Sequence, residues 1–431
     1  MKKILRGNAS RLTGIIQVPG DKSISHRAVL FGAIANGKTT ISNFLFGEDC
    51  LRTIECMEKL GVVIERDVQH KKVVVYGTGI NGLKEPKEIL YTGNSGTTTR
   101  LLLGLLSATN FYSVIVGDES IQRRPMDRVV IPLKKMGALI DGRQNGSYTP
   151  ISVRGTNLQS ITYELPVASA QVKSALLLAG LFGDGITLRG KIHTRDHTEQ
   201  MLSSFGVDVR MSEEEIVLKG GQSLKATTID VPGDFSSAAF FIVMALIVPN
   251  SKIVIKNVGL NKTRTGLLDV IQSMGGQVEL KNVSEVNGET RGTIIVQYSS
   301  LKATTIDGAI IPRLIDEIPI IALLATQAAG TTWIRNASEL KVKESNRIKT
   351  VVQQLQKLGA NIEELEDGMK IIGKTTLKGG CTVSACGDHR IGMMLAAASL
   401  ICENDIELED EQCISISYPN FFQDLNQLVE Y

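Results

Sequence analysis

Residues 232–255 read PGDFSSAAFFIVMALIVPNSKIVI, and this stretch shows the pattern on which the chain is built. A turn that contains Asp and Ser leads into residues 240–247, which are apolar on every side. A helix without a polar face is expected to be buried. A small-residue turn and a β-rich strand follow. The opening Val-Pro-Gly-Asp stands at both 18–21 and 231–234, each time before a helix start that contains serine.

The helix–turn–strand pattern occurs in six copies, at residues 28–41, 101–116, 174–188, 238–255, 318–334 and 391–408. In five copies a second, amphipathic helix follows and ends in a large residue and Gly, which fits the left-handed conformation of a helix C-terminus. These ends are Leu60-Gly61, Met136-Gly137, Phe205-Gly206, Met274-Gly275 and Leu358-Gly359. A spacing of roughly 65–85 residues is long for a solenoid unit and suits a β-α-β-α-β-β module.

Six modules, together with the Val-Pro-Gly-Asp sequence that recurs at 18–21 and 231–234, predict two domains of three modules each. A chain of 431 residues also exceeds an ordinary single core. The expected fold is an inverted α/β fold, inside-out and barrel-like, in which sheets wrap buried helices. We expect domain I to contain residues 1–14 and 233–431, and domain II residues 15–232. The crossings near 12–20 and 228–234 contain Gly and Pro and are expected to act as hinges beside an active site in the interdomain cleft.

The overall charge gives no case for a nucleic-acid partner, because 47 basic and 45 acidic residues leave a net charge of +2. Any preference for anions must therefore be local. Residues 1–8 are charged but lack the apolar stretch of a signal peptide, and the longest apolar run, 238–248, is too short to span a bilayer. We expect a cytoplasmic protein, a monomer, with no membrane partner. Buried reduced thiols are the expected state of Cys50, Cys56, Cys381, Cys386, Cys402 and Cys413.

Small polar and cationic residues precede an apolar helix at five places, namely residues 21–27, 93–100, 169–173, 232–237 and 387–390. Helix N-termini present unpaired backbone N–H groups and about half a positive charge, so they bind anions. One such start is common. Several in one chain, rich in Lys and Arg, indicate a ligand with more than one anionic group.

Eight short motifs follow one another along the chain: PGDKSISHR at 19–27, GNSGTTTR at 93–100, RPM at 124–126, SAQVKSA at 169–175, TRDHTE at 194–199, RN at 335–336, KVKESNRI at 341–348 and GDHR at 387–390. With these motifs in this order, the chain resembles the 5-enolpyruvylshikimate-3-phosphate synthase family from end to end. The resemblance implies transfer of the enolpyruvyl group of phosphoenolpyruvate to the 5-hydroxyl of shikimate 3-phosphate, with release of phosphate. Addition and then elimination would proceed through a tetrahedral intermediate, in the shikimate pathway of aromatic amino-acid biosynthesis. No metal or cofactor is implied.

The resemblance assigns a set of residues to each substrate. For phosphoenolpyruvate they are Lys22, Asn94, Gly96, Thr97, Arg124, Gln171, Arg347 and Arg390, of which the three arginines look like a bidentate clamp. For shikimate 3-phosphate they are Lys22, Ser23, Arg27, Ser169, Ala170, Gln171, Arg195, Asp316 and Lys343. Simple helix capping is the alternative for Ser23 and Ser169. A surface ion pair is the alternative for any single arginine.

Four residues match the catalytic positions of the family. Asp316 looks like the group that holds or deprotonates the attacking hydroxyl, and capping of a helix near Pro319 is its alternative. Glu344 is expected to protonate the methylene carbon and later take a proton back. Lys22 and His389 complete the set, His389 near the leaving phosphate, with a purely structural histidine as the alternative.

The chain departs from the family pattern at three places. Many members carry a Lys near the C-terminus, but residues 413–419 read CISISYP without one. One cationic contact to phosphoenolpyruvate is therefore expected to be absent or supplied elsewhere. Ser169-Ala170 replaces a pair of serines of one branch, and Leu101 replaces a Pro. These residues are nearer the branch in which several members tolerate the herbicide glyphosate.

Two other functions fit part of the pattern. The related UDP-N-acetylglucosamine enolpyruvyl transferases typically have Lys-Asn where this chain has Lys22-Ser23, and a reactive Cys in a loop where residues 105–130 have none. A non-catalytic anion-binding scaffold would keep the cations but need no proton-transfer groups. The presence of both Asp316 and Glu344 favours the enzyme over the scaffold.

Overall fold

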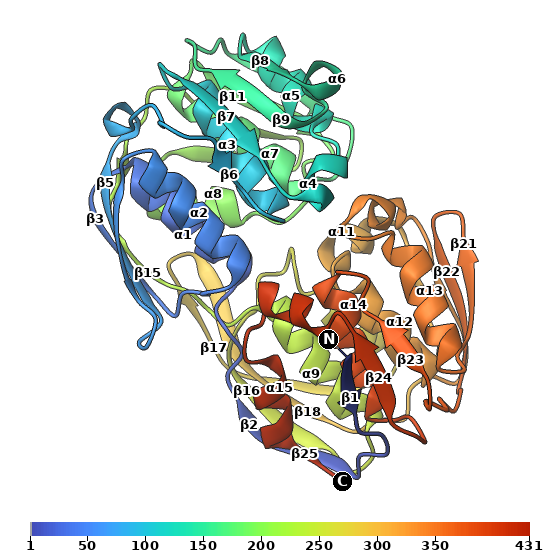
Figure 1. Cartoon of the computed structure of the whole chain (residues 1–431). Coiled ribbons are helices and arrows are strands. Elements are labelled where there is room, and N and C mark those ends of the chain that lie inside the picture. Colours follow the sequence, from blue (N-terminus) through green and yellow to red (C-terminus); the bar gives the residue numbers. More distant parts are fainter. Residues whose placement is uncertain (1) are drawn as a thin grey trace. The chain divides into compact units, whose positions relative to one another are not determined.

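The computed structural model describes residues 2–431, which form two compact units (Figure 1). Unit 1 comprises the residues up to Pro19, Pro232–Glu285 and Thr290–Tyr431, whereas unit 2 comprises Gly20–Val231 and Val286–Glu289. Residues 15–19, which the sequence analysis assigns to domain II, fall in unit 1. The segment 286–289 falls in unit 2, although the sequence predicted it to belong to domain I.

Unit 2 contains the first three modules. The first has α1 (Lys22–Ile34), β3 (Ala35–Ser42), α2 (Glu48–Lys59), β4 (Val63–Asp67) and β5 (Lys72–Thr78). The second has β6 (Leu90–Tyr91), α3 (Gly96–Ser107), β7 (Tyr112–Val116), α4 (Glu119–Arg123), α5 (Asp127–Lys135), β8 (Leu139–Gly142), α6 (Arg143–Gly146) and β9 (Tyr148–Arg154). The third has β10 (Ile161–Leu165), α7 (Ala170–Phe182), β11 (Gly185–Gly190), α8 (His197–Ser204), β12 (Val209–Met211) and β13 (Glu215–Lys219), followed by β14 (Leu224–Lys225) and β15 (Thr228–Asp230). The sheet orders are β14-β3-β5-β4, with β15 also on β3, then β6-β7-β9-β8 and β10-β11-β13-β12.

Unit 1 contains the other three modules and both chain ends. It begins with β1 (Lys2–Leu5) and β2 (Arg11–Ile16) and resumes with α9 (Phe235–Ile247), β16 (Lys252–Gly259), α10 (Gly266–Ser273), β17 (Gln277–Val286) and β18 (Glu289–Gln297). The fifth module has β19 (Thr305–Ile306), α11 (Ile311–Leu314), α12 (Ile318–Thr326), β20 (Gly330–Ile334), α13 (Arg347–Lys357), β21 (Asn361–Leu365) and β22 (Gly368–Gly373). The sixth has β23 (Thr382–Ser384), α14 (His389–Ser399), β24 (Ile406–Glu409), α15 (Phe421–Leu428) and β25 (Val429–Glu430). The sheet orders are β17-β18-β16-β2-β25, β19-β20-β22-β21 and β1-β24-β23.

The first and fourth modules exchange their leading strands. In the other modules the strand before the first helix pairs in parallel with the strand after it, as β6 does with β7 and β19 with β20. β2 precedes α1 in the chain but pairs in parallel with β16 of unit 1, and β15 precedes α9 but pairs in parallel with β3 of unit 2. This exchange explains why the chain passes between the units after Pro19 and after Val231.

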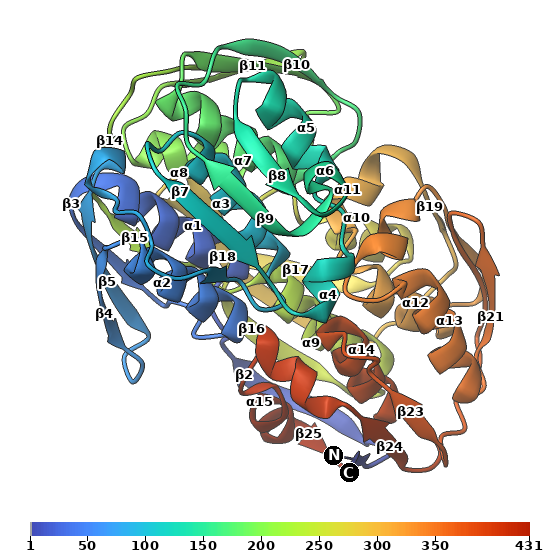
Figure 2. The same ribbon diagram turned by 45° about the horizontal axis from the view of Figure 1, so that its top comes forward.

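The first helix of each module is buried inside its unit and the sheets cover it, as the apolar pattern predicts (Figure 2). Every residue of α9, α12 and α14 is buried. In unit 2, α3 and α7 pack so closely that a Cβ on Gly104 would lie 2.1 Å from the carbonyl oxygen of Ala175, so a larger residue does not fit. Among residues 2–431 no sheet closes into a barrel, so the fold is inverted α/β with open sheets.

Polar residues define where the helices begin and glycines where they end. Asp21, Ser95, Ser169, Asp234 and Asp388 cap α1, α3, α7, α9 and α14, each by accepting a backbone N–H of the first turn. The helix-end glycines at 61, 137, 206, 275 and 359 all have φ between +80° and +100°, which confirms the predicted ends. Five buried helices thus begin at the five polar stretches seen in the sequence.

All six cysteines are free. Cys50, Cys56, Cys402 and Cys413 are buried as predicted, and burial raises the pKa of the last three to about 12. The prediction is wrong for Cys386, which is exposed, and for Cys381, which is partly exposed, because both lie in the segments flanking the short strand β23. No helix in the described part of the chain has the length and apolarity needed to cross a bilayer.

Candidate active site

Lys22 lies at the start of α1 in unit 2, where it already has a counter-ion. Its Nζ is 2.5 Å from Oδ2 of Asp49. Asp21 caps the helix by accepting the N–H of Ile24 at 2.9 Å, so the capping alternative for Ser23 is wrong. The Asp49 carboxylate offsets the unfavourable placement of a lysine at a helix N-terminus.

Arg27, one turn further along α1, is held by neutral oxygen atoms. Its Nε donates to Oγ1 of Thr198 and its Nη2 to Oγ of Ser174, both at 2.7 Å. Nη1 donates to the carbonyl oxygen of Ser23 at 3.0 Å, which brings two predicted substrate residues together. The two hydroxyl oxygens lie 2.6 Å apart. These three acceptors fix the direction of the guanidinium.

Gln171 and Thr97, predicted from two different motifs, are in direct contact. Nε2 of Gln171 donates to Oγ1 of Thr97 at 3.0 Å, and Oε1 accepts from Nη1 of Arg100 at 2.7 Å. Arg100 also donates to the carbonyl oxygen of Pro125 at 3.1 Å. Arg100 therefore links the starts of α3 and α7 to the segment before α5, a role that the sequence analysis missed although Arg100 lies within a quoted motif.

Gly96 leaves room for two guanidinium groups. A Cβ at this position would lie 2.7 Å from Nη2 of Arg124 and 2.8 Å from Nη1 of Arg100. Nη1 of Arg124 donates to the carbonyl oxygen of Asn94 at 3.5 Å, and the Asn94 side chain donates to Asp118 at 2.9 Å. Unit 2 thus brings Asn94, Gly96, Thr97, Arg124 and Gln171 together, and their contact with phosphoenolpyruvate stays a prediction.

The remaining predicted residues of unit 2 lie beside α7 and α8. Ser169 caps α7 by accepting the N–H of Val172 at 3.4 Å, and Ala170 is the first residue of that helix. The capping interpretation of Ser169 is confirmed, and its contact with substrate stays a prediction. Arg195 is partly buried just before α8.

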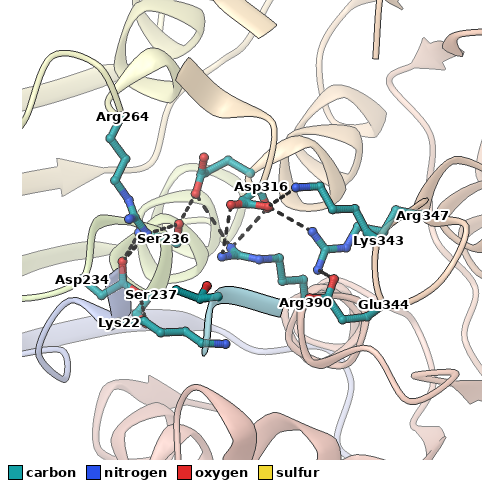
Figure 3. Close-up of polar contacts among 12 residues, drawn as sticks. Lys22, Asp234, Ser236, Ser237, Arg264, Asp316, Lys343, Glu344, Arg347 and Arg390 are labelled. Atoms are coloured by element: carbon teal, nitrogen blue, oxygen red, sulfur yellow. Dashed lines mark hydrogen bonds and ion pairs between the residues drawn. The ribbon is translucent and has the colours of Figure 1, made fainter. Parts of the chain in front are cut away.

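In unit 1 the centre of the predicted site is Arg347, at the start of α13 (Figure 3). This buried guanidinium donates to three carboxylates: Nε to Asp388 at 2.8 Å, Nη1 to Asp316 at 3.1 Å and Nη2 to Glu344 at 2.6 Å. Burial alone would lower the pKa of Arg347, but the charges of Asp388, Glu344 and Asp316 outweigh it and raise the pKa. Both predicted proton-transfer residues are therefore tied to one cation.

Asp316 also faces the other two predicted cations of unit 1 (Figure 3). Nζ of Lys343 lies 3.5 Å from its Oδ1, and Nη1 of Arg390 donates to its carbonyl oxygen at 3.2 Å. The capping alternative for Asp316 is wrong, because Glu317 is the N-cap residue of α12. His389 is the first residue of α14 and is buried.

The arrangement in unit 1 suits proton transfer beside bound anions. Two carboxylates can exchange protons, and the cations around them can stabilise negative charge on a ligand. Asp388 and Glu317 contribute to this environment, and Asp49 pairs with Lys22 in unit 2, but none of the three was predicted as a site residue. Their sequence signal is weak, because an acidic residue at a helix start most often serves as a cap or a dipole partner.

Comparison with known proteins extends over nearly the whole chain. The sequence profile of the family described as EPSP synthase (3-phosphoshikimate 1-carboxyvinyltransferase) matches residues 7–425. The chain is 58% identical over 420 residues to a 3-phosphoshikimate 1-carboxyvinyltransferase of Bacillus pumilus, covering 97% of this chain and 98% of that protein. It is also 58% identical over 424 residues to the protein of the same name of Bacillus subtilis, covering 98% and 99%.

Solved structures support the same relationship. An EPSP synthase from Acinetobacter baumannii shares 41% sequence identity with a TM-score of 0.87, covering 99% of this chain and 98% of that one. The enolpyruvyl transferase NikO from Streptomyces tendae has a TM-score of 0.80 at 17% identity, covering 100% and 98%, and shows the likeness of the fold alone.

Proposed function

Because the chain belongs to the EPSP synthase family, we infer that it transfers the enolpyruvyl (1-carboxyvinyl) group of phosphoenolpyruvate to the 5-hydroxyl of shikimate 3-phosphate and releases phosphate. The full-length identity to curated relatives is the observation that carries this conclusion. The reaction belongs to the shikimate pathway of aromatic amino-acid biosynthesis.

We assign the binding of phosphoenolpyruvate to cations from both units. Arg124 and Lys22 of unit 2 and Arg347 and Arg390 of unit 1 pair with its carboxylate and phosphate, since guanidinium groups match both geometrically. Asn94, Gly96, Thr97 and Gln171 line the same part of the site. The contact between Gln171 and Thr97 at 3.0 Å and the space at Gly96 support this grouping.

Shikimate 3-phosphate binds at the starts of α1, α7 and α8. The residues assigned to it are Lys22, Ser23, Arg27, Ser169, Ala170, Gln171, Arg195, Asp316 and Lys343. The hydrogen bonds of Arg27 to two hydroxyls and a carbonyl oxygen support the assignment, because they fix the direction of its guanidinium. Asp316 and Lys343 lie 3.5 Å apart and would meet the reacting hydroxyl.

In the proposed chemistry, Glu344 donates a proton to C3 of phosphoenolpyruvate while Asp316 accepts the proton of the 5-hydroxyl. The hydroxyl oxygen bonds to C2, and the tetrahedral intermediate forms. Phosphate then leaves as Glu344 removes a proton from C3 and the double bond is restored. Lys22 and His389 stabilise the charge of the leaving phosphate. The 2.6 Å bond from Arg347 orients Glu344 for both proton transfers.

The assigned residues come from both units, so both must contribute to one substrate complex. We propose that the units close around the substrates, with the crossings near residues 12–20 and 228–234 as hinges.

We further propose that the protein is a cytoplasmic monomer. Its mass of 46.7 kDa gives the value expected from light scattering after size-exclusion chromatography, and a mass near twice that value would contradict the monomer.

We also propose that the chain lies nearer the branch with glyphosate-tolerant members. The support is limited to Ala170 and Leu101, which match that branch.

Phosphate release tests the function directly. Purified protein should release phosphate with phosphoenolpyruvate and shikimate 3-phosphate together and with neither alone. Release with UDP-N-acetylglucosamine in place of shikimate 3-phosphate would favour the related transferase. Binding of both substrates without release would favour a non-catalytic scaffold.

A further inference from the structure

Glu317 follows Asp316 in the chain and has no part in the chemistry described above. It is the N-cap residue of α12 and is only 1% exposed. Its side chain does not cap the helix, because it accepts no backbone N–H there. Burying a carboxylate is costly unless a cation lies close to it, so this residue calls for a partner.

Two arginines are linked to the Glu317 carboxylate, one of them through a hydroxyl. Oε1 accepts a short hydrogen bond from the hydroxyl of Ser236, which in turn accepts one from Nη2 of Arg264 at 2.8 Å. Nη1 of Arg390 lies 3.8 Å from the same Oε1. Since Ser236 belongs to α9 and Arg390 to α14, Glu317 connects the starts of the three buried helices of unit 1.

Arg390 uses its hydrogen-bond donors differently from Arg347. Within residues 2–431, the guanidinium of Arg390 has one hydrogen-bond acceptor, the carbonyl oxygen of Asp316 at 3.2 Å. The carboxylate oxygens of Asp316 and Glu317 are both 3.8 Å away, beyond hydrogen-bond length. A guanidinium has five N–H donors. The two carboxylates therefore fix the position of Arg390 while leaving most of its donors to a ligand.

We propose that Glu317 is a positioning residue that directs the guanidinium of Arg390 toward phosphoenolpyruvate and thereby sets the affinity for that substrate. This inference rests on the proposed function, in which Arg390 binds phosphoenolpyruvate. The negative charge of Glu317 holds one edge of the guanidinium, and the chain of Ser236 and Arg264 holds Glu317 itself. Without the charge, Arg390 would lose its ionic contact with Glu317 and keep only its two contacts with Asp316, the hydrogen bond to the carbonyl oxygen and the 3.8 Å approach to the carboxylate.

The variant Glu317→Gln separates positioning from a structural role. It keeps the size of the side chain and can accept the Ser236 hydroxyl, but it removes the charge that faces Arg390. The KM for phosphoenolpyruvate should rise about tenfold, the effect of one charge-assisted contact. The KM for shikimate 3-phosphate should change by less than about twofold and kcat by less than about threefold. A loss of stability alone would not raise the KM for phosphoenolpyruvate while leaving the KM for shikimate 3-phosphate nearly unchanged.

Glu199→Gln is the matched control. Glu199 is also 1% exposed and pairs with Lys173 at 2.6 Å, but it belongs to unit 2, whereas Arg390 belongs to unit 1. It should lower the melting temperature without a selective rise in the KM for phosphoenolpyruvate. Equal changes of that KM in both variants, or no change in Glu317→Gln, would overturn the proposal.

Calorimetric titration with phosphoenolpyruvate, in the presence of shikimate 3-phosphate, keeps this test independent of turnover. If the wild-type protein binds both substrates but releases no phosphate, the proposed function fails, while a tenfold weaker titration of Glu317→Gln still supports the positioning role.

If Glu317→Gln does not fold, the variant Ser236→Ala provides the test instead. Removing this hydroxyl leaves both charges but loosens Glu317, so the phosphoenolpyruvate affinity should fall about threefold, and an unchanged affinity would overturn the proposal.

Discussion

The two units hold their predicted substrate-binding arginines in different ways. In unit 2, Arg27 donates to two hydroxyls and a carbonyl oxygen, and Arg100, which was not among the predicted site residues, donates to an amide and a carbonyl oxygen. In unit 1, Arg347 donates to three carboxylates. Hydroxyl, amide and carbonyl oxygens only orient a guanidinium, whereas carboxylates can also take up and release protons. The carboxylates suited to proton transfer are thus gathered around Arg347 in unit 1.

The largest expected effect comes from neutralising the proton donor of unit 1. Glu344→Gln should lower kcat by about 10²- to 10⁴-fold, the usual contribution of a general acid–base residue, while both substrates still bind. Steady-state kinetics together with calorimetric titration would measure this. Glu363→Gln, which removes a surface pair with Lys370 in the same unit, should leave turnover unchanged. Full turnover in Glu344→Gln would break the assignment of proton transfer to this residue.

Replacing the two arginines of unit 1 should separate stability from binding. Arg347→Met would leave three carboxylates without their shared cation and should cost about 3–5 kcal/mol of unfolding free energy. Arg390→Met should cost less than half of that, because it removes one hydrogen bond to a carbonyl oxygen and two carboxylate contacts of 3.8 Å rather than three charged hydrogen bonds, and should mainly raise the KM for phosphoenolpyruvate. Urea denaturation of both variants gives the comparison. Equal losses of stability would contradict the difference drawn between the two arginines.

Replacing a hydroxyl that accepts a hydrogen bond from Arg27 tests whether uncharged acceptors orient this arginine for substrate binding. Thr198→Val removes the acceptor of Nε and should raise the KM for shikimate 3-phosphate about tenfold, since a hydrogen bond to a charged group contributes about 1.5–3 kcal/mol. The KM for phosphoenolpyruvate should stay unchanged. Thr39→Val is the control, because this buried hydroxyl has no hydrogen-bond partner in the described part of the chain. Similar increases in the KM for both substrates would argue against a specific role of Thr198 in orienting Arg27.

The smallest expected effect is a pH dependence of stability from His26 in α1. Burial, with the nearby charges of Lys22 and Arg27, lowers its pKa well below 6.5, and Nδ1 contacts Thr53 at 2.6 Å. The unfolded chain binds a proton below about pH 6.5 that the folded chain does not, so the contribution is complete above that pH and falls as the pH decreases. The slope should be at most about 1.4 kcal/mol per pH unit. The variant His26→Asn should lack this slope, and identical pH profiles would contradict the account.

The sequence predicted the fold well because its signal is local and repeated. The all-apolar helices, the caps such as Asp234 and the helix-end glycines each depend on a few adjacent residues. The exchange of β2 and β15 between modules could not be predicted, because it depends on which of two similar strands pairs with β16 or β3. The excursion of residues 286–289 also depends on tertiary contacts, such as the 2.6 Å contact between Glu289 and His197.

Site residues could be predicted only at positions that match the pattern of the family. The sequence brought Thr97 and Gln171 into one group, and they are in contact. It gave no sign that Asp49 pairs with Lys22, or that Glu317 rather than Asp316 is the first residue before α12. The side-chain partners of a buried charge depend on packing between helices that are far apart in sequence, which no short pattern records.

Deuterium incorporation tests the central claim most directly. The reaction would be run in D₂O with phosphoenolpyruvate and shikimate 3-phosphate, and the product examined by NMR. Addition followed by elimination predicts an enolpyruvyl ether at the 5-oxygen that carries deuterium in its vinyl methylene group, and Glu344→Gln should form almost none of it. A product without deuterium, or phosphate release without the ether, would contradict the proposed transfer and the role of Glu344 in it.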